Sequence, residues 1–269
     1  MIHGAISGKY CMPARRKPAS AKRTKAKAAA PIPRGPDAAA VISELRRRSS
    51  KRVREGMSRY GIPSDKAFGV SVGDMRRLAK RLGRSHALAE SLWKTGWYEA
   101  RMLATFVAEP ERVTSAQMDR WCKDFDSWAI CDTACFHLFD RSPHAWGRIA
   151  AWSRRKPEFE KRAAFALLAC LALHDKSAET ERFAGALPMI EKASLDERNF
   201  VKKSVSWALR AIGRRNGELH AAAVAASMRL AGSDNAAARW IGRDSLRELT
   251  GAVVERQMAS KRQSGVKRR

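Results

Sequence analysis

Between Asp37 and about Thr250, the chain is a succession of short stretches with helical periodicity, and no stretch alternates apolar and polar residues as a strand does. Helix-start signals recur, as in Ser71–Asp74 and Thr114–Gln117, which have the spacing of capping boxes. A fold built from helices alone follows. The pattern predicts helices over residues 37–48, 50–60, 72–82, 85–95, 97–108, 115–124, 127–140, 143–154, 157–173, 178–191, 195–214, 216–231 and 234–250.

The predicted helices are short, and so are the joints between them, which favours antiparallel helix pairs stacked side by side. HEAT-type solenoids are organised in this way, and their repeats are degenerate in sequence. No strict repeat at one period is visible, and a compact helical bundle is the alternative. The predicted fold class is an all-α, HEAT-like helical-repeat solenoid.

Positive charge is the main compositional feature, since Lys and Arg number 53 against 27 Asp and Glu, for a net charge of +26. Residues 1–36 hold nine of these cations and residues 261–269 hold five more, and without them the net charge is still +12. A basic folded part indicates a polyanionic partner. We predict a disordered basic tail over 1–36, the helical domain over 37–252 and a basic C-terminal tail over 253–269. The first tail is either a solvated extension or a DNA-tethering arm.

Several protein classes are excluded by what the sequence lacks. The five cysteines are odd in number and irregularly spaced, which argues against a disulfide framework, and no His or Cys pair completes a zinc set around Cys131 and Cys135. No apolar stretch is long enough to cross a membrane, and no secretion signal is visible. Phosphate-binding and dinucleotide fingerprints are absent. The sequence therefore predicts no metal, no cofactor and no membrane partner, in a reducing cytoplasm.

The segment Val201–Gly213 has a strongly two-sided helical pattern. Its apolar residues cluster within roughly 100° of the helix circumference and predict the buried face. Trp207 lies on the opposite side, where its neighbours are Lys203, Arg210 and Arg214. Trp and Arg can stack on sugar or base while cations neutralise phosphate, which points to nucleic acid. The alternative is a Trp packed against a neighbouring repeat.

The segment Asp126–Asp132 begins a helix that is apolar nearly all round, which predicts a central place in the fold. Asp126 or Ser127 can cap this helix. Trp128 and Asp132 lie one turn apart on the same face. An unpaired carboxylate among aromatic residues is costly, so Asp132 needs either a structural partner or a site that requires negative charge.

Arg162 occupies a helix face that otherwise holds Ala166, Ala169 and Leu173. An Arg that is buried or lines a groove needs an anion. The candidates are Asp132 and a DNA phosphate, and a purely structural pair between Asp132 and Arg162 remains open at this point.

Four motifs, in this order along the chain, resemble those of the AlkD-like DNA alkylation-repair family. The resemblance covers roughly residues 40–250 and omits both tails. It implies a HEAT-like solenoid whose concave, basic face holds duplex DNA. Active family members are DNA glycosylases that release N3- and N7-alkylated purines. The motifs are Trp121–Asp132, Lys161–Phe165, Asp196–Arg210 and Ala238–Trp240.

The resemblance implies a role for each matched residue. The family's catalytic aspartate matches Asp132, and its groove arginine matches Arg162. Its two DNA-contacting tryptophans match Trp128 and Trp207. An N3- or N7-alkylpurine already carries positive charge and leaves without protonation, so a carboxylate need only stabilise the sugar cation and orient water. The resemblance further implies that the lesion can stay stacked, without the base flipping that most glycosylases use.

Ala129 departs from the family pattern, because relatives often carry Asp there, and a secondary carboxylate is therefore in doubt. We predict a monomeric DNA glycosylase, cytoplasmic and nucleoid-associated, that acts on duplex DNA containing alkylated bases. The alternative is a non-catalytic HEAT-like protein that binds distorted or branched DNA, as some relatives with this solenoid do. A protein-binding scaffold fits the basic core poorly.

Overall fold

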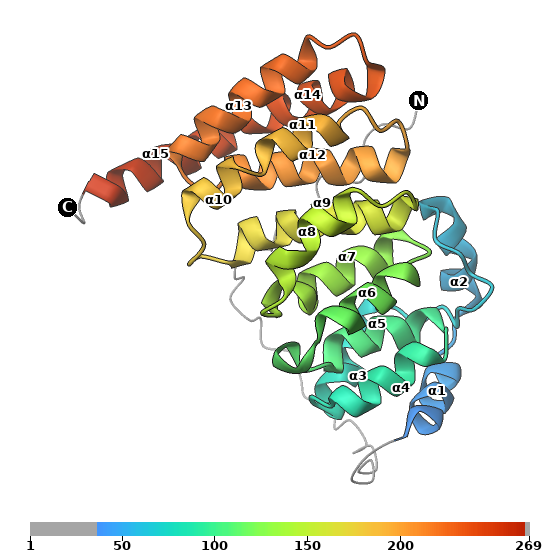
Figure 1. Cartoon of the computed structure of the whole chain (residues 1–269). Helices are drawn as coiled ribbons and strands as arrows, with labels where there is room; N and C mark the ends of the chain where they lie inside the picture. Colours follow the sequence, from blue (N-terminus) through green and yellow to red (C-terminus); the bar gives the residue numbers. More distant parts are fainter. Residues whose placement is uncertain (1–36, 267–269) are drawn as a thin grey trace, which may run out of the picture. The chain divides into compact units, whose positions relative to one another are not determined.

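In the computed structural model, the structure describes residues 37–266, which lie in the compact unit Arg34–Arg269. This part is all-α and contains no strand (Figure 1). Three 3-10 helices, η1 (Ser58–Tyr60), η2 (Pro110–Arg112) and η3 (Phe139–Arg141), accompany the α-helices. The α-helices are α1 (Ala38–Arg47), α2 (Lys51–Met57), α3 (Val72–Leu82), α4 (His86–Lys94), α5 (Tyr98–Val107), α6 (Ser115–Lys123), α7 (Trp128–His137), α8 (Ala145–Ser153), α9 (Glu158–His174), α10 (Thr180–Ala184), α11 (Leu187–Ala193), α12 (Asn199–Gly213), α13 (Gly217–Ala231), α14 (Ala236–Leu249) and α15 (Ala252–Val266).

Side-chain caps explain where many of these helices begin. The backbone N–H of Asp74 donates to the Ser71 hydroxyl at 3.1 Å, and that of Gln117 donates to the Thr114 hydroxyl at 3.1 Å, as the capping-box spacing predicts. Ser127 is the N-cap residue of α7, but its side chain makes no capping hydrogen bond. The predicted helix starts agree with the helix bounds of the structure to within a few residues.

Two predicted segments differ from the structure. The single helix expected over 178–191 is two short helices, α10 and α11, because Pro188 lies in the first turn of α11 and has no N–H to continue a preceding helix. The C-terminal tail expected over 253–269 is largely helical, since α15 runs to Val266 and buries Val254 and Met258. The folded part thus extends past the predicted boundary at 252. The predicted basic tail over 1–36 lies outside the described residues.

The helices stack as in a HEAT-like repeat. The helices α5, α7, α9, α12 and α14 pack successively against one another, and α4, α8 and α13 each pack against the partner that follows in the chain (Figure 1). Short turns join these pairs, so the two helices of a pair run in opposite directions. Predicted and observed architectures agree on this point.

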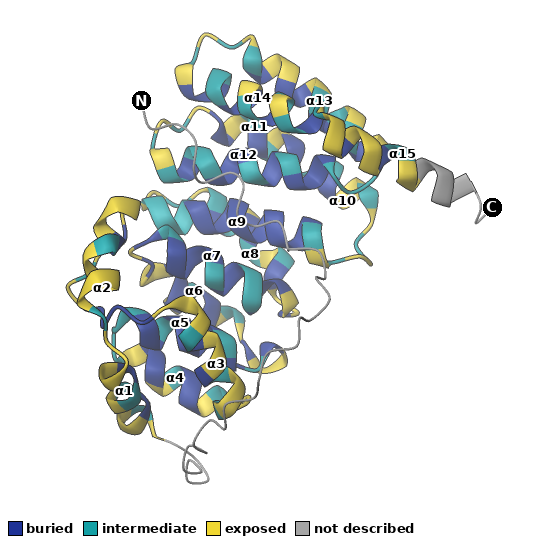
Figure 2. Ribbon diagram, turned by 180° about the vertical axis from the view of Figure 1, so that it is seen from behind, coloured by how far each residue is buried: buried dark blue, intermediate teal, exposed yellow. Residues whose placement is uncertain are grey.

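Helices α7, α9 and α12 lie at the centre of the stack, and most of their residues are buried (Figure 2). In α9 every residue from Arg162 to Ala172 is buried, and Arg162 is the only charged residue among them. A guanidinium in such surroundings is stable only with an anionic partner. The core of the fold therefore leads directly to the site described below.

The loop between η1 and α3 is held by a buried carboxylate. Glu99 of α5 accepts hydrogen bonds from the backbone N–H groups of Phe68 at 2.9 Å, Gly69 at 2.7 Å and Val70 at 3.1 Å. Gly69 has φ of 81°, and a Cβ there would lie 2.2 Å from the Ser50 carbonyl oxygen, so only glycine fits. Glu99 thereby fixes the segment that carries Tyr60 towards α7.

Candidate DNA-binding and catalytic site

Asp132 and Arg162 form a buried, bidentate ion pair between α7 and α9. Arg162 Nε donates to Asp132 Oδ1 at 2.9 Å, and Arg162 Nη2 donates to Asp132 Oδ2 at 2.7 Å. The exposed fractions of the two side chains are 8% for Asp132 and 7% for Arg162. The pair forms because α7 and α9 are neighbours in the stack. It fixes the orientation of the carboxylate in two directions, as a parallel fork contact does.

Trp128 lies one turn before Asp132, at the start of α7, and is half-buried. Its indole Nε1 donates to the backbone carbonyl of Tyr60 at 2.7 Å. Its ring packs on a small apolar cluster that includes Met57 and Ala129. A carboxylate at position 129 would be buried in that cluster without a partner and would be costly there.

Arg162 has a second partner, besides Asp132, that the sequence did not reveal. Its Nη1 donates to the carbonyl of Phe200, in the first turn of α12, at 2.6 Å. The N–H of Phe200 in turn donates to the Glu158 carboxylate, at the start of α9, at 3.0 Å. These contacts lie 38 and 42 residues apart in sequence. Glu158 therefore helps to position Phe200, and the carbonyl of Phe200 in turn positions Arg162.

The link between α11 and α12 is tied down by further charges. Asp196 accepts from Lys161 Nζ at 2.9 Å and from Arg198 Nε at 2.8 Å, and Arg198 Nη1 donates to the carbonyl of Lys156 at 2.6 Å. The hydrogen bonds from Arg198 and Lys161 hold the pKa of the Asp196 carboxyl below its usual range. Because this link enters α12 directly, it helps to fix the Phe200 carbonyl.

Lys203 and Trp207 lie on the less buried face of α12, as the sequence predicted. Burial, together with the nearby cations Arg162 and Lys202, lowers the pKa of the Lys203 ammonium. No acidic side chain forms an ion pair with Lys203 within the residues that the structure describes. A cation placed beside other cations without a carboxylate is suited to a phosphate.

Arg210 and Arg214 share this face, but their charge is compensated within the protein. Both donate to the carboxylate of Glu248 in α14, and Arg214 Nη2 also donates to Gln257 at 3.0 Å. The structure therefore separates the predicted cations of α12 into two groups. Lys203 lies near Arg162, whereas Arg210 and Arg214 hold α12 to the C-terminal helices.

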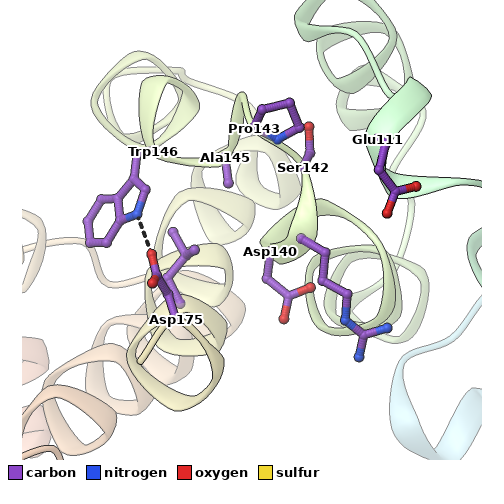
Figure 3. A pocket seen from close by; sticks show the side chains of 9 residues that line it. Glu111, Asp140, Ser142, Pro143, Ala145, Trp146 and Asp175 are labelled. Atoms are coloured by element: carbon purple, nitrogen blue, oxygen red, sulfur yellow. Dashed lines mark hydrogen bonds between the residues drawn. The ribbon is translucent and has the colours of Figure 1, made fainter. Parts of the chain in front are cut away.

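A pocket of about 440 Å³ lies away from the Asp132–Arg162 pair, between the turns that follow α5, α7 and α9 (Figure 3). Its lining includes Glu111, Asp140, Trp146 and Asp175, and Trp146 Nε1 donates to Asp175 at 2.9 Å. Burial raises the pKa of the Asp140 carboxyl, whose Oδ2 contacts His174. Three carboxyl groups and one arginine, Arg141, line this pocket, and the excess of acidic groups disfavours phosphate, so the pocket is a poor candidate for DNA.

The buried cysteines near the pair are part of the packing. Cys131 Sγ contacts the carbonyl of Phe159 and Cys135 Sγ contacts that of Ala163, each at 3.7 Å. Burial raises the pKa of the Cys135 thiol well above its usual range, which makes it unreactive. No group of three His, Cys, Asp or Glu side chains among the described residues has the arrangement of a metal site. Within the same part of the chain, no helix has the length and apolar character needed to cross a membrane.

Comparison with known proteins decides the family. A family model described as "DNA alkylation repair enzyme" matches residues 41–249, which is the stretch from α1 to the end of α14. The chain belongs to the DNA alkylation repair enzyme family. The family match spans the Asp132–Arg162 pair as well as Trp128, Lys203 and Trp207. No curated protein sequence matches the chain at a significant level.

Of two solved structures similar to this DNA alkylation repair family member, the first supports the HEAT-like fold. One is described as "A new family of proteins related to the HEAT-like repeat DNA glycosylases with affinity for branched DNA structures"; it is 21% identical, with a TM-score of 0.66, and the alignment covers 79% of this chain and 95% of that one. A designed armadillo repeat protein is 15% identical, with a TM-score of 0.30, over 73% of this chain and 99% of that one.

The Glu158 contact provides a first prediction. Glu158→Gln should weaken the hydrogen bond from the Phe200 N–H and loosen the carbonyl that holds Arg162, at a cost of about 1 kcal/mol in the free energy of unfolding. If Asp132 acts as the catalytic carboxylate of a glycosylase, as proposed below, the maximal rate of base release should fall more than the DNA affinity, because only the orientation of Asp132 changes. Urea unfolding and single-turnover assays measure the two effects. Equal losses in rate and affinity would contradict a positioning role.

Proposed function

We propose that this chain is a DNA glycosylase that releases N3- and N7-alkylated purines from duplex DNA, with Asp132 as the catalytic carboxylate. The observation that carries the proposal is the buried, bidentate Asp132–Arg162 pair, with Trp128 one turn before Asp132 and with Lys203 near Arg162. Among the described residues, no acidic side chain forms an ion pair with Lys203. Family membership supports a role in the repair of alkylated DNA.

The chemistry of the substrate suits this arrangement. A cationic alkylpurine leaves without an acid, so the developing charge is on the sugar, and a fixed carboxylate stabilises it through electrostatics and orients the attacking water. Trp128 and Trp207 favour the same cation through their π faces, by about 0.5–2 kcal/mol each. In the proposal, Lys203 contacts an adjacent phosphate, whereas the buried Arg162, which donates to Asp132 and to the Phe200 carbonyl, orients Asp132 and makes no direct phosphate contact. Arg210 and Arg214 strengthen the α12 face, although Glu248 compensates much of their charge.

A second candidate is a non-catalytic protein that binds branched or distorted DNA. Two observations favour it. Both oxygens of Asp132 are occupied by Arg162, as in a purely structural ion pair, and the structurally similar protein described above belongs to a family with affinity for branched DNA. In that case the face of α12 that carries Lys203 and Trp207 binds DNA, but no glycosidic bond is broken.

Release of 7-methylguanine separates the two candidates. The purified chain is incubated with methylated duplex DNA, and the freed base is quantified by chromatography, with binding to a four-way junction and to a linear duplex measured in parallel. Release that depends on the chain supports the glycosylase. A folded chain that binds the junction more tightly than the duplex and releases no base supports the second candidate. Absence of DNA binding at low salt would contradict both.

The proposal extends to partners and location. A glycosylase that grips one lesion needs a single copy of the site, so we expect a monomer on DNA that contains alkylated bases. Its substrate places it with the chromosome, in the cytoplasm and associated with the nucleoid. The expected chemistry requires no cofactor.

A further inference from the structure

The exposed face of α14 carries a row of arginines around a tryptophan, and the site described above does not use it. Arg239, Arg243 and Arg247 follow at intervals of four residues and line a shallow pocket of about 260 Å³ together with Trp240. The opposite face of α14 is buried against α13. At Gly242 a Cβ would lie 2.2 Å from the backbone nitrogen of Ala231, so the two helices touch through their backbones and the arginine face is directed outwards.

A lysine of α12 completes the group. The ammonium of Lys202 lies 4.9 Å from the centre of the Trp240 ring, at cation–π distance. The ring limits the positions available to the lysine side chain, so the ammonium is held on the same surface as the arginines. Lys202 is next to Lys203 and two residues after Phe200, whose carbonyl binds Arg162. The row therefore continues the surface of the candidate site.

The cations of this group outnumber the acidic side chains around them. Arg239 donates to the carbonyls of Ser233 and Asp234, and Arg247 contacts Asp244, which also accepts from the Ser206 hydroxyl at 2.8 Å. These contacts fix the two arginines without removing the excess charge, because Asp244 is the only acid of the pocket. The exposed Arg243 makes no hydrogen bond or ion pair with any residue that the structure describes.

We propose that Lys202, Trp240 and the arginines Arg239, Arg243 and Arg247 form a second DNA-binding station, which grips the sugar-phosphate backbone of the duplex beside the lesion. This inference rests on the proposed function, because it takes duplex DNA as the ligand. The arginine row is about 12 Å long at 1.5 Å per residue. One strand of B-DNA presents about three to four phosphates over that length. Packed helices lie about 8–10 Å apart, so the arginine row of α14 is about three nucleotide steps from α12.

Trp240 holds Lys202 and lies among the arginines of α14. This arrangement is suited to the sugar-phosphate backbone of DNA rather than to the edge of a base. Phosphate contacts from Lys and Arg fix the register of a protein on DNA and carry no sequence information, and the ring can contact a deoxyribose. The station therefore contributes affinity and register at all sequences.

The salt dependence of DNA binding tests the proposal. Wild type, the double variant Lys202→Gln/Arg243→Gln and the control Lys192→Gln are compared as full chains on an undamaged, fluorescein-labelled duplex by anisotropy over a range of salt concentrations. Lys192 is an exposed lysine of α11, outside the station. Each lost phosphate contact should reduce the slope of log affinity against log salt by about 0.9, so the double variant should lose about 1.8 and Lys192→Gln nothing. All three chains carry the same basic residues in 1–36, which therefore cancel.

A folded double variant whose slope of log affinity against log salt equals that of the wild type would contradict the proposed second DNA-binding station. Circular dichroism and thermal unfolding establish that the variant is folded. Base release by the wild type, measured separately, keeps the two proposals apart. If the slope falls although the wild type releases no base, the station stands and the glycosylase fails. If the wild type releases base and the slope does not change, the glycosylase stands and the station fails.

Discussion

Replacing Asp132 by Asn should reduce the release of 7-methylguanine on the order of 10²-fold, which corresponds to about 2.7 kcal/mol of lost transition-state stabilisation. Asn keeps the shape of the side chain and one acceptor oxygen but removes the charge that would stabilise the sugar cation in the proposed reaction. The measurement is single-turnover release from methylated duplex DNA, with the DNA affinity of the variant determined alongside. We expect the affinity to stay within a few-fold of wild type, because Arg162 and Lys203 still attract phosphate.

The same substitution should also lower the stability of the fold. It leaves the buried guanidinium of Arg162 without a counter-charge, and breaking a buried pair from one side costs about 3–5 kcal/mol. Asp119→Asn is a matched control, because Asp119 accepts from Arg148, Arg155 and the Trp152 indole far from the proposed chemistry. The control should lose stability and keep its rate of release. Equal rate losses in both variants would show that Asp132 acts through stability alone.

Replacing Glu99 by Ala should be among the most destabilising single changes in the chain. Glu99 is fully buried and accepts three backbone hydrogen bonds, and each N–H left unpaired costs about 1–3 kcal/mol. We expect a loss of about 3–5 kcal/mol in the free energy of unfolding, measured by urea denaturation. Because the loop it holds follows Tyr60, the Trp128 contact should loosen as well.

Glu99→Gln tests the reason for that loss. The amide keeps one acceptor oxygen and places an NH₂ group against donors, so the loss should be smaller than for Ala, about 1–3 kcal/mol. An Ala variant no less stable than the Gln variant would contradict the role of the three accepted hydrogen bonds.

Much of the architecture was predictable from local pattern. The helix ranges follow from periodicity and from capping residues such as Ser71 and Thr114, whose hydrogen bonds form as expected. The possible pairing of Asp132 with Arg162 was also predictable, because a buried Arg needs an anion and Asp132 was one of the two candidates, with a DNA phosphate as the other. The structure shows the pair, whereas its catalytic use remains a prediction.

Other parts of the site depend on contacts that no local pattern encodes. The Tyr60 carbonyl meets the Trp128 indole across 68 residues, and backbone carbonyls carry no residue-type signal. The compensation of Arg210 and Arg214 by Glu248 depends on how α14 packs on α12, so the helical face alone overstated their free charge. In each case the missing information is the packing of one helix on another.

The Tyr60 turn has a consequence for how the chain unfolds. In a repeat protein each unit usually touches only its neighbours, so stability is additive along one dimension and the ends can melt separately. Here the Tyr60 carbonyl bonds to Trp128, and a Cβ on Gly61 would lie 3.0 Å from the Phe200 ring. The turn at Tyr60, near the beginning of the stack, therefore contacts both α7 and α12, which lie further along it. The chain should melt in one cooperative transition, and damage to its first helices should be felt at the Asp132–Arg162 pair.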